Sequence, residues 1–298
     1  MAVDQIRNYL TLEKHYSAHT VKAYLRDLEQ FHQYCVDNHE MTSLEDLPYS
    51  IIRSWIITQM EAGCTNRTIN RKVASLRAYY KFLIRKERIA ASPLASHRPL
   101  KTDRRLEVPF SVEEMSRLFS QEAFESDYEG LRDRLVVELL YTTGIRRAEL
   151  IGIRLRDLDL NAGTLKVLGK RNKERLIPLV KSLEPLCQQY LEVRNETFPQ
   201  EEEDYLFLSG SGNKMYETLV YRIINKYLGE VSAKVKKSPH VLRHTFATHM
   251  LNKGADMNSV KELLGHASLA STQVYTHNSI AELKRIHLDA HPRNKESS

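Results

Sequence analysis

Three imidazoles and one guanidinium fall within ten residues of the segment HVLRHTFATH, between His240 and His249. His240 and Arg243 stand three residues apart, so on a helix they would share one face. Pro239 directly precedes His240, and proline is tolerated in the first helical turn, where backbone N–H groups lack partners. Anions bind at helix N-termini because of these free N–H groups and the helix dipole. The segment therefore predicts a phosphate site formed by His240 and Arg243.

Zinc binding and a purely structural role are the alternatives for this cluster. Zinc is considered because His240 and His244 have the i, i+4 spacing of one class of metalloprotease helix. That motif requires a glutamate after the first histidine, and the sequence has Val241 there. The cation of Arg243, directly before His244, would also repel a dication. We therefore expect no metal here, and packing or hydrogen-bonding roles for His244 and His249.

Further groups suited to phosphate chemistry lie elsewhere in the C-terminal part of the chain. Arg146 follows a glycine-containing turn in TTGIRRAEL, at or near the start of a helix. His266 follows Gly265, which is expected to end a helix, and Tyr275 lies nine residues further on. With Lys170 in a predicted hairpin, these residues suit phosphoryl transfer through a covalent tyrosine. Tyr275 as an ordinary core residue is the alternative.

The first 90 residues show the apolar spacing of helices, with one beginning after Ser17, another over residues 51–60 and a third from Thr65. The third helix carries seven basic residues and no acid before Glu87. Such a helix is suited to contacts with a phosphate backbone, with a solvated helix face as the alternative. We predict DNA or RNA contact through these residues: Arg67, Arg71, Lys72, Arg77 and Lys81.

Residues 91–109 contain three prolines and no amphipathic period, which indicates a linker. The next helix is predicted from a capping-box pattern that starts at Ser111. From Asp157 the period changes to that of three short strands joined by tight turns. The chain is therefore predicted to be mainly α with one small antiparallel β-sheet, in two domains of residues 1–90 and 110–298.

Composition limits the classes of function further. The net charge is +6, and residues 1–98 hold 14 Lys and Arg against 10 Asp and Glu; this excess suits a polyanionic partner or an ordinary solubilising surface. The three cysteines form no CxxC pair, which argues against a disulfide or zinc framework. No signal-peptide pattern and no apolar run of membrane-spanning length occurs. We expect a cytoplasmic protein that does not enter the membrane.

In the segments around the candidate phosphate-binding residues, the sequence resembles the tyrosine recombinase (lambda-integrase) family, and its bacterial Xer branch in particular. The matching segments, in the family's order and spacing, are TTGIRRAELIGIRLRDLDL, GKRNKERLIPL, SPHVLRHTFATHML, LLGHASLASTQVYTH and the closing HP at His291. The resemblance covers nearly the whole chain, and the motifs are specific as a set. It implies a helical core-binding domain that clamps DNA over residues 1–90, followed by a catalytic domain over residues 110–298.

The resemblance implies a role for each polar residue of the set. Tyr275 would be the nucleophile and Lys170 the acid that protonates the leaving oxygen, with Lys173 as the alternative acid. Arg147 departs from the family pattern. Since adjacent helical residues point about 100° apart, only one of Arg146 and Arg147 can face the phosphate. We expect Arg146 to be that residue. Glu149 is expected to support the site. The implied catalytic set is Arg146, Lys170, His240, Arg243, His266 and Tyr275.

The implied activity is site-specific recombination of duplex DNA through a 3′-phosphotyrosine, without metal, ATP or another cofactor. Chromosome dimer resolution, integration and inversion of DNA all fit this chemistry. A type IB topoisomerase, which shares the tyrosine chemistry, is the alternative, and a non-catalytic DNA-binding protein and a metal-dependent nuclease are further ones. The family implies an inverted-repeat DNA site, a homo- or heterotetramer on that site, and a second recombinase or a DNA translocase as partners.

The segment after Tyr275 has apolar residues at helical spacing. They are Ile280, Leu283, Ile286 and Leu288. The resemblance implies a C-terminal tail that docks on a neighbouring protomer, and docking on its own domain is the alternative.

Overall fold

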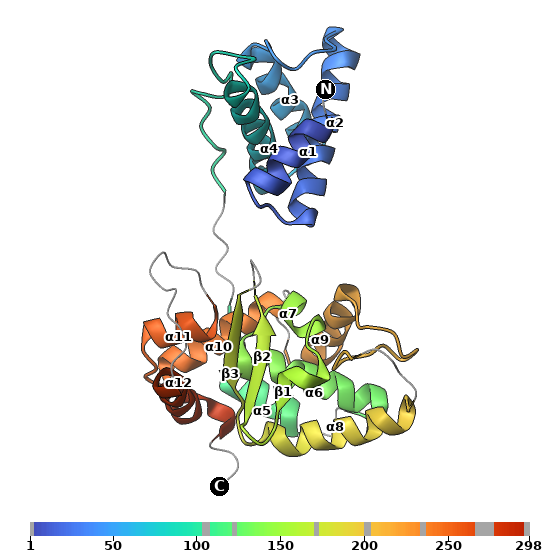
Figure 1. Ribbon diagram of the computed structural model, residues 1–298, viewed down its shortest axis with the longest axis vertical. Coiled ribbons are helices and arrows are strands. Elements are labelled where there is room, and N and C mark those ends of the chain that lie inside the picture. Colours follow the sequence, from blue (N-terminus) through green and yellow to red (C-terminus); the bar gives the residue numbers. More distant parts are fainter. Residues whose placement is uncertain are drawn as a thin grey trace. The chain divides into compact units, whose positions relative to one another are not determined.

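The computed structural model describes residues 3–102, 108–120, 124–169, 173–199, 204–232, 237–265 and 277–294, with the backbone alone at 277–282. Within these residues the chain is mostly helical and has one three-stranded antiparallel sheet, as predicted. It divides into two compact units, Met1–Arg105 and Leu106–Ser298, each with its own hydrophobic core (Figure 1). No helix of the described residues is both long and apolar enough to cross a membrane.

The first unit is helical. Its elements are α1 (Val3–Asn8), a π-helical turn (Tyr9–Glu13), α2 (Ala18–His39), α3 (Tyr49–Glu61) and α4 (Asn66–Arg85). The side chains of Ser17 and Thr65 cap α2 and α4, each accepting the backbone N–H of the residue three positions on. Both predicted helix starts are confirmed. α4 packs against α2 and α3 through an apolar stripe that includes Leu76 and Leu83.

Part of the predicted linker lies against the first unit. Leu94 is buried in the core of this unit. The Leu100 N–H donates to Asn70 Oδ1, and Asn70 Nδ2 donates to the Leu100 carbonyl, both over 2.9 Å. The unit therefore extends past the predicted boundary at residue 90, because an α4 side chain pairs with the backbone of this proline-containing stretch.

The second unit holds the sheet and the remaining helices. The strands are β1 (Leu158–Asp159), β2 (Thr164–Leu168) and β3 (Glu174–Pro178), in that order across the sheet. The helices are α5 (Val112–Ser120), α6 (Tyr128–Thr143), α7 (Arg147–Ile151), α8 (Leu183–Thr197), α9 (Glu217–Val231), α10 (Pro239–Asn252), α11 (Met257–Leu263) and α12 (His277–Ala290), with 3-10 turns at Leu155–Asp157 and Pro292–Asn294. The buried helix α6 is packed by α8, α9 and α10 (Figure 1).

The capping box predicted at the start of α5 is present. The Ser111 N–H donates to Glu114 Oε2 over 2.7 Å, and the Glu114 N–H donates to Ser111 Oγ over 3.1 Å. The pairing of β2 with β3 aligns Lys166 with Leu176, so the three predicted strands are confirmed as well.

His249 joins α10 to α6 and to the start of the second unit. Its Nε2 lies 2.9 Å from the Phe110 carbonyl, which only accepts, so Nε2 carries the proton and Nδ1 accepts from the Tyr141 hydroxyl over 2.9 Å. Burial lowers the pKa of His249 and favours this neutral ring. The structural role predicted for His249 is confirmed, whereas His244 is exposed.

Helix α12 packs on its own domain. Leu283 is buried in the core of the second unit, and Ile286 packs against that core. His287 is fully buried, and its Nε2 donates to the Thr142 carbonyl over 2.7 Å. In the isolated chain, residues 283–291 thus dock in cis, the alternative to docking on a neighbouring protomer, because their apolar face completes the domain's own core. Ile280 carries no described side chain.

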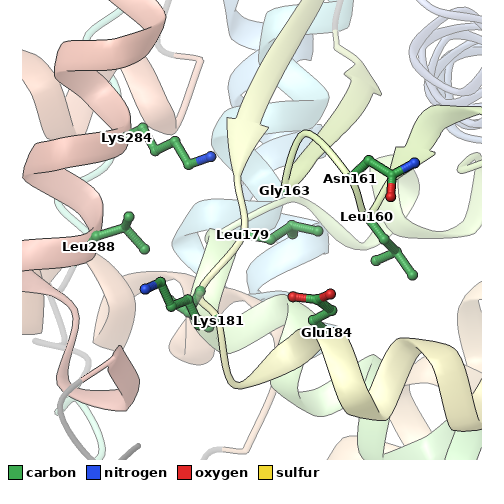
Figure 2. A pocket seen from close by; sticks show the side chains of 9 residues that line it. Leu160, Asn161, Gly163, Leu179, Lys181, Glu184, Lys284 and Leu288 are labelled. Carbon is green, nitrogen blue, oxygen red and sulfur yellow. The ribbon is translucent and has the colours of Figure 1, made fainter. Parts of the chain in front are cut away.

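A cleft of about 170 Å³ separates α12 from the turn between β1 and β2 (Figure 2). Lys284 and Leu288 line it from α12, Lys181 lines it from the loop before α8, and Glu184 from the first turn of α8. Lys284 Nζ donates to the Ala162 carbonyl in the turn over 3.0 Å. This contact attaches α12 to the sheet side of the domain.

Acid should weaken the docking of α12. Burial lowers the pKa of His287 to about 4, and burial together with His287 lowers the pKa of His291 well below its ordinary value. Between about pH 6.5 and 4 the unfolded chain therefore binds more protons than the folded chain. The free energy of unfolding should fall through this window as the pH is lowered, by up to about 1.4 kcal/mol per pH unit for each histidine. Calorimetric melting temperatures will measure this loss.

His287→Gln provides the matched control for this prediction. Glutamine keeps an N–H donor for the Thr142 carbonyl but does not titrate. The variant should lose less melting temperature than the wild type between about pH 6.5 and 5. An equal loss in both proteins would show that His287 is not a source of the acid sensitivity.

Candidate active site

Arg146 lies at the turn between α6 and α7. Gly144 ends α6 at a φ of +61°, a left-handed conformation that glycine adopts without strain, and a Cβ there would lie 2.5 Å from the Phe246 ring. Arg146 Nη1 donates to Glu149 Oε1 over 2.9 Å, and the Arg146 backbone N–H donates to Oε2 over 2.8 Å. The Arg146 side chain is 27% exposed, so solvent and ligands can reach it.

Arg147 lies in a different environment from its neighbour. Its Nη2 pairs with Glu217 at the start of α9. The two adjacent arginines therefore point to different partners. The reason differs from the one expected, because Arg146 is the extended N-cap residue and only Arg147 belongs to helix α7.

Arg243 reaches from α10 to the turns beside it. Its Nη1 donates to the Gly144 carbonyl and its Nη2 to the Leu264 carbonyl, both over 2.6 Å. Burial, followed by the nearby charge of Arg146, lowers the pKa of Arg243 to about 10, so the side chain stays charged at neutral pH. Arg243 thus joins the turn before α7 to the end of α11.

A buried carboxylate holds the arginines together. Glu149 is 6% exposed, and its two oxygens also accept from Nη1 and Nη2 of Arg175, each over 2.9 Å. Burial raises the pKa of the Glu149 carboxyl, but hydrogen bonds from Arg175 and Arg146 outweigh burial, and the pKa lies below its ordinary value. Among the described residues, the charges of Arg146, Arg175 and Arg243 thus act around one carboxylate. The excess positive charge suits a phosphate group.

The sequence interpretation included Glu149 as a support but missed Arg175. Arg175 stands in KERLIPL on β3, where strand alternation places it on the same buried face as Ile177. A charged residue at a position of the apolar face was the available signal, because a buried charge requires a partner.

The structure describes only part of the predicted catalytic set. It brings together Arg146 and Arg243, as described above. His240 is exposed in the first turn of α10, which begins at Pro239 as predicted. Lys170, His266 and Tyr275 lie outside the described residues. In the part of the chain that the structure describes, no group of three His, Cys, Asp or Glu residues could hold a metal ion.

The residues on either side of the gaps are nevertheless described. The N–H of Gly169, which directly follows β2, donates to the Lys173 carbonyl over 2.8 Å. Gly265 follows α11 at a φ of +63°, as the predicted helix end. α12 begins two residues after Tyr275.

The predicted nucleic-acid contacts of α4 differ in their surroundings. Arg67 and Lys81 are exposed. Arg71 is also exposed, although its guanidinium pairs with the buried Asp27 of α2. Arg77 is half-buried, and its Nη2 lies 3.4 Å from a backbone carbonyl.

The structure does not agree with a phosphate contact by Lys72. This side chain is buried, and its ammonium donates to Gln30 Oε1 over 2.7 Å and to Gln59 Oε1 over 2.6 Å. It also lies 5.6 Å from the centroid of the Trp55 ring. Lys72 therefore holds α2, α3 and α4 together, a role that its basic neighbours in the sequence conceal.

Two family models match the chain. The model described as "Phage integrase family" matches residues 99–282, and the model described as "Phage integrase, N-terminal SAM-like domain" matches residues 3–87. Among curated proteins, tyrosine recombinase XerC of Staphylococcus carnosus is 40% identical over 290 residues, which cover 96% of this chain and 95% of the relative. Tyrosine recombinase XerC of Chlorobaculum parvum is 38% identical and covers 96% of this chain and 92% of the relative.

Solved structures share the fold. The XerH recombinase in a post-cleavage complex with a palindromic difH substrate has a TM-score of 0.71 and 20% identity, and the match covers 99% of this chain and 84% of that one. The Tn1549 transposon integrase in complex with circular intermediate DNA has a TM-score of 0.68 and 22% identity, with 95% and 98% covered. These relatives are recombinases and integrases, and they give no support to the topoisomerase alternative.

Proposed function

Because the chain belongs to the phage integrase family and is a tyrosine recombinase that cleaves DNA and exchanges its strands, we propose that six of its residues form the catalytic set. They are Arg146, Lys170, His240, Arg243, His266 and Tyr275. The observation that carries this proposal is the charged cluster around Glu149, where Arg146 and Arg243 are held in place beside each other.

The reaction consists of two balanced phosphoryl transfers. The Tyr275 oxygen attacks the phosphorus of a DNA phosphodiester and the bond to the 5′-oxygen breaks, which leaves a 3′-phosphotyrosine. Lys170 donates a proton to the leaving 5′-oxygen, and the phenolic proton passes to His240. The 5′-hydroxyl of a partner strand then attacks the phosphotyrosine and gives its proton to Lys170, while His240 returns a proton to the leaving phenolate, which restores a phosphodiester and the tyrosine. The phosphotyrosine conserves the bond energy, so no ATP is consumed.

The arginines supply charge to the transition state. A guanidinium binds the oxygens of a phosphate in a planar, bidentate manner. Arg146 and Arg243 clamp the non-bridging oxygens, where negative charge increases as the tyrosine attacks, and His240 and His266 complete the cage with hydrogen bonds. Since Arg146 and Arg243 are already held by Glu149 and by backbone carbonyls, little reorganisation of these two arginines accompanies the reaction.

The first unit contacts the DNA backbone through α2 and α4. A cleft of about 270 Å³ between these helices is lined by Arg26, Gln30 and Arg71 among others. Of the exposed cations of α4, Arg71 lines this cleft, and Arg67 and Lys81 lie elsewhere on the helix; together with the half-buried Arg77 they support phosphate contacts along α4. Lys72 contributes by fixing Gln30 at the cleft.

The substrate is a duplex site with inverted repeats, bound by a tetramer of this chain alone or with a second recombinase. The XerC relatives are tyrosine recombinases similar over nearly the full length. Among the roles that this chemistry allows, we propose chromosome dimer resolution, which would make a DNA translocase a further partner. Integration or inversion of DNA uses the same chemistry. Chromosome-wide mapping of covalent adducts distinguishes these roles by the position of the cleaved site.

Replacing the nucleophile provides the direct test. Tyr275→Phe should abolish covalent protein–DNA adducts, because the hydroxyl forms the bond. DNA affinity should stay within a few-fold of the wild type, because phosphate contacts dominate affinity. Denaturing gels with labelled DNA measure the adduct, and gel shifts measure the affinity. Adducts that persist in this variant would assign the nucleophile to another residue.

The phosphate clamp should depend on the shape of its cation as well as on its charge. Arg243→Ala should slow cleavage by about 10²–10³, the effect of losing one transition-state donor. Arg243→Lys should retain more activity but remain impaired, because one ammonium cannot span the Gly144 and Leu264 carbonyls. Single-turnover cleavage rates provide the measurement.

Arg147 provides the control for the neighbouring arginine. Arg147→Ala should reduce cleavage less than Arg146→Ala, because Arg147 pairs with Glu217 on α9. A larger loss for Arg147→Ala would transfer the clamp to that residue.

The proposed acid is testable with sulfur chemistry. An alkoxide needs a proton to leave, whereas a thiolate does not, since thiols ionise near pKa ~8.5. Lys170→Ala should therefore cleave ordinary DNA slowly, yet cleave DNA with a bridging 5′-sulfur at close to the wild-type rate. Arg243→Ala should show no such rescue, because it removes charge stabilisation. Without rescue of Lys170→Ala, Lys170 would act as a phosphate clamp, and Lys173 would be the next candidate acid.

A further inference from the structure

Arg175 is a buried cation at the junction of three chain segments. Its guanidinium lies on β3 with the residue only 6% exposed. Nη1 and Nη2 donate to the two oxygens of Glu149, and Nε donates to the Leu263 carbonyl over 3.1 Å. One side chain thus connects the sheet to the start of α7 and to the end of α11.

Two glycines lie directly against this guanidinium. A Cβ on Gly265 would lie 3.1–3.2 Å from its Nη1, Nε and Cζ atoms. A Cβ on Gly169 would lie 3.4 Å from Nη1 and 3.3 Å from the Lys173 carbonyl. Both distances are shorter than ordinary van der Waals contact or at its lower edge, so the guanidinium fills the space where each glycine would carry a side chain.

Each of these two glycines directly precedes a proposed catalytic residue. Lys170 follows Gly169, and His266 follows Gly265. The two glycines are distant in the chain and have in common their contact with the same guanidinium and their position one residue before a catalytic candidate.

Fold stability alone is a weak explanation for this arrangement. A buried ion pair contributes little net stability compared with apolar side chains of similar volume. An apolar residue at position 175 would match Ile177 on the same strand face, yet it could not hold Glu149 and the Leu263 carbonyl simultaneously. The charge is therefore better explained by what it orients.

We propose that Arg175 is a positioning residue that places Lys170 and His266 relative to the phosphate clamp. It does so by supporting the backbone at Gly169 and Gly265 and by holding the carboxylate that orients Arg146. The inference rests on the roles proposed above for Lys170 and His266.

Arg175→Lys provides the main test, because it keeps the charge and removes the bidentate fork. Single-turnover cleavage of ordinary DNA should slow by roughly 10–10²-fold, the effect of misplacing a reacting group by about 1 Å. DNA affinity should stay within a few-fold of the wild type. DNA with a bridging 5′-sulfur should show a distinctly smaller loss, because misplacement of the proton donor no longer matters for that substrate. A merely structural role would lower both rates by the same factor.

Arg132→Lys provides the matched control. Arg132 is likewise buried, at 2% exposure, and ion-paired, with Nη2 donating to Asp133 over 2.8 Å, but it stands near the start of α6, at the opposite end of the helix from Gly144. In this variant, the ratio of the cleavage rate on sulfur-containing DNA to the rate on ordinary DNA should be similar to that of the wild type. A sulfur-dependent rescue in Arg132→Lys would show that the readout reports general destabilisation.

Gly169→Ala tests the same contact without changing a buried charge. The added methyl would lie 3.3 Å from the Lys173 carbonyl and 3.4 Å from Arg175 Nη1, so it should shift the hairpin slightly against the guanidinium and reproduce part of the sulfur-rescued defect. In the Arg175→Lys background the effect of Gly169→Ala should be smaller than in the wild type, because the two residues are in contact. Fully multiplicative rate losses would overturn the proposed contact.

The outcomes separate this inference from the proposed function. If Lys170→Ala is not rescued by sulfur, the proposed role of Lys170 is wrong, whatever Arg175 does. Suppose instead that sulfur rescues Lys170→Ala. If Arg175→Lys then cleaves ordinary DNA at the wild-type rate, or if its cleavage rate falls by the same factor on both substrates, Arg175 does not position Lys170 and the present inference is wrong.

Discussion

The shared carboxylate of Glu149 is the interaction on which the rest of the site depends. Guanidinium groups that approach one another away from water repel strongly, and the lowered pKa of Arg243 is a measure of that burial and repulsion. Glu149 accepts from Arg146 and Arg175 at once and offsets part of this cost. A single carboxylate leaves the cluster positive, so it can form in the folded protein and still attract a phosphate.

Backbone carbonyls orient the same cations without cancelling their charge. Arg243 donates to Gly144 and Leu264, and Arg175 donates to Leu263. A carbonyl is a dipole with no net charge, so each of these contacts fixes a guanidinium without neutralising it, and Arg243 keeps its full charge for a ligand. The same contacts hold distant segments of the site together, because the arginines link the turn after α6, strand β3 and the end of α11.

Local interactions were predictable from the sequence and distant ones were not. The caps at Ser17, Thr65 and Ser111 act over three residues, so the pattern of residue types reveals them. The burial of Lys72 depends on glutamines of α2 and α3, and the role of Arg175 depends on Glu149 of α7. The cis packing of α12 likewise depends on a core built by other helices. Apolar spacing predicts that a helix has a partner, but it does not identify the partner.

The charged cluster also explains how a phenol can act as a nucleophile in this protein. An ordinary phenol has a pKa of about 10 and is mostly protonated at neutral pH. Burial makes this worse: it raises the pKa of Tyr128 and raises that of Tyr190 well above its ordinary value, and both lie in the core of the second unit. A tyrosine nucleophile therefore gains nothing from an apolar pocket and needs positive charge that stabilises its anion and the phosphate it attacks. In the described part of the chain, the excess positive charge around Glu149 is of the kind that such a nucleophile requires, which supports the arginines as the source of the reactivity proposed for Tyr275.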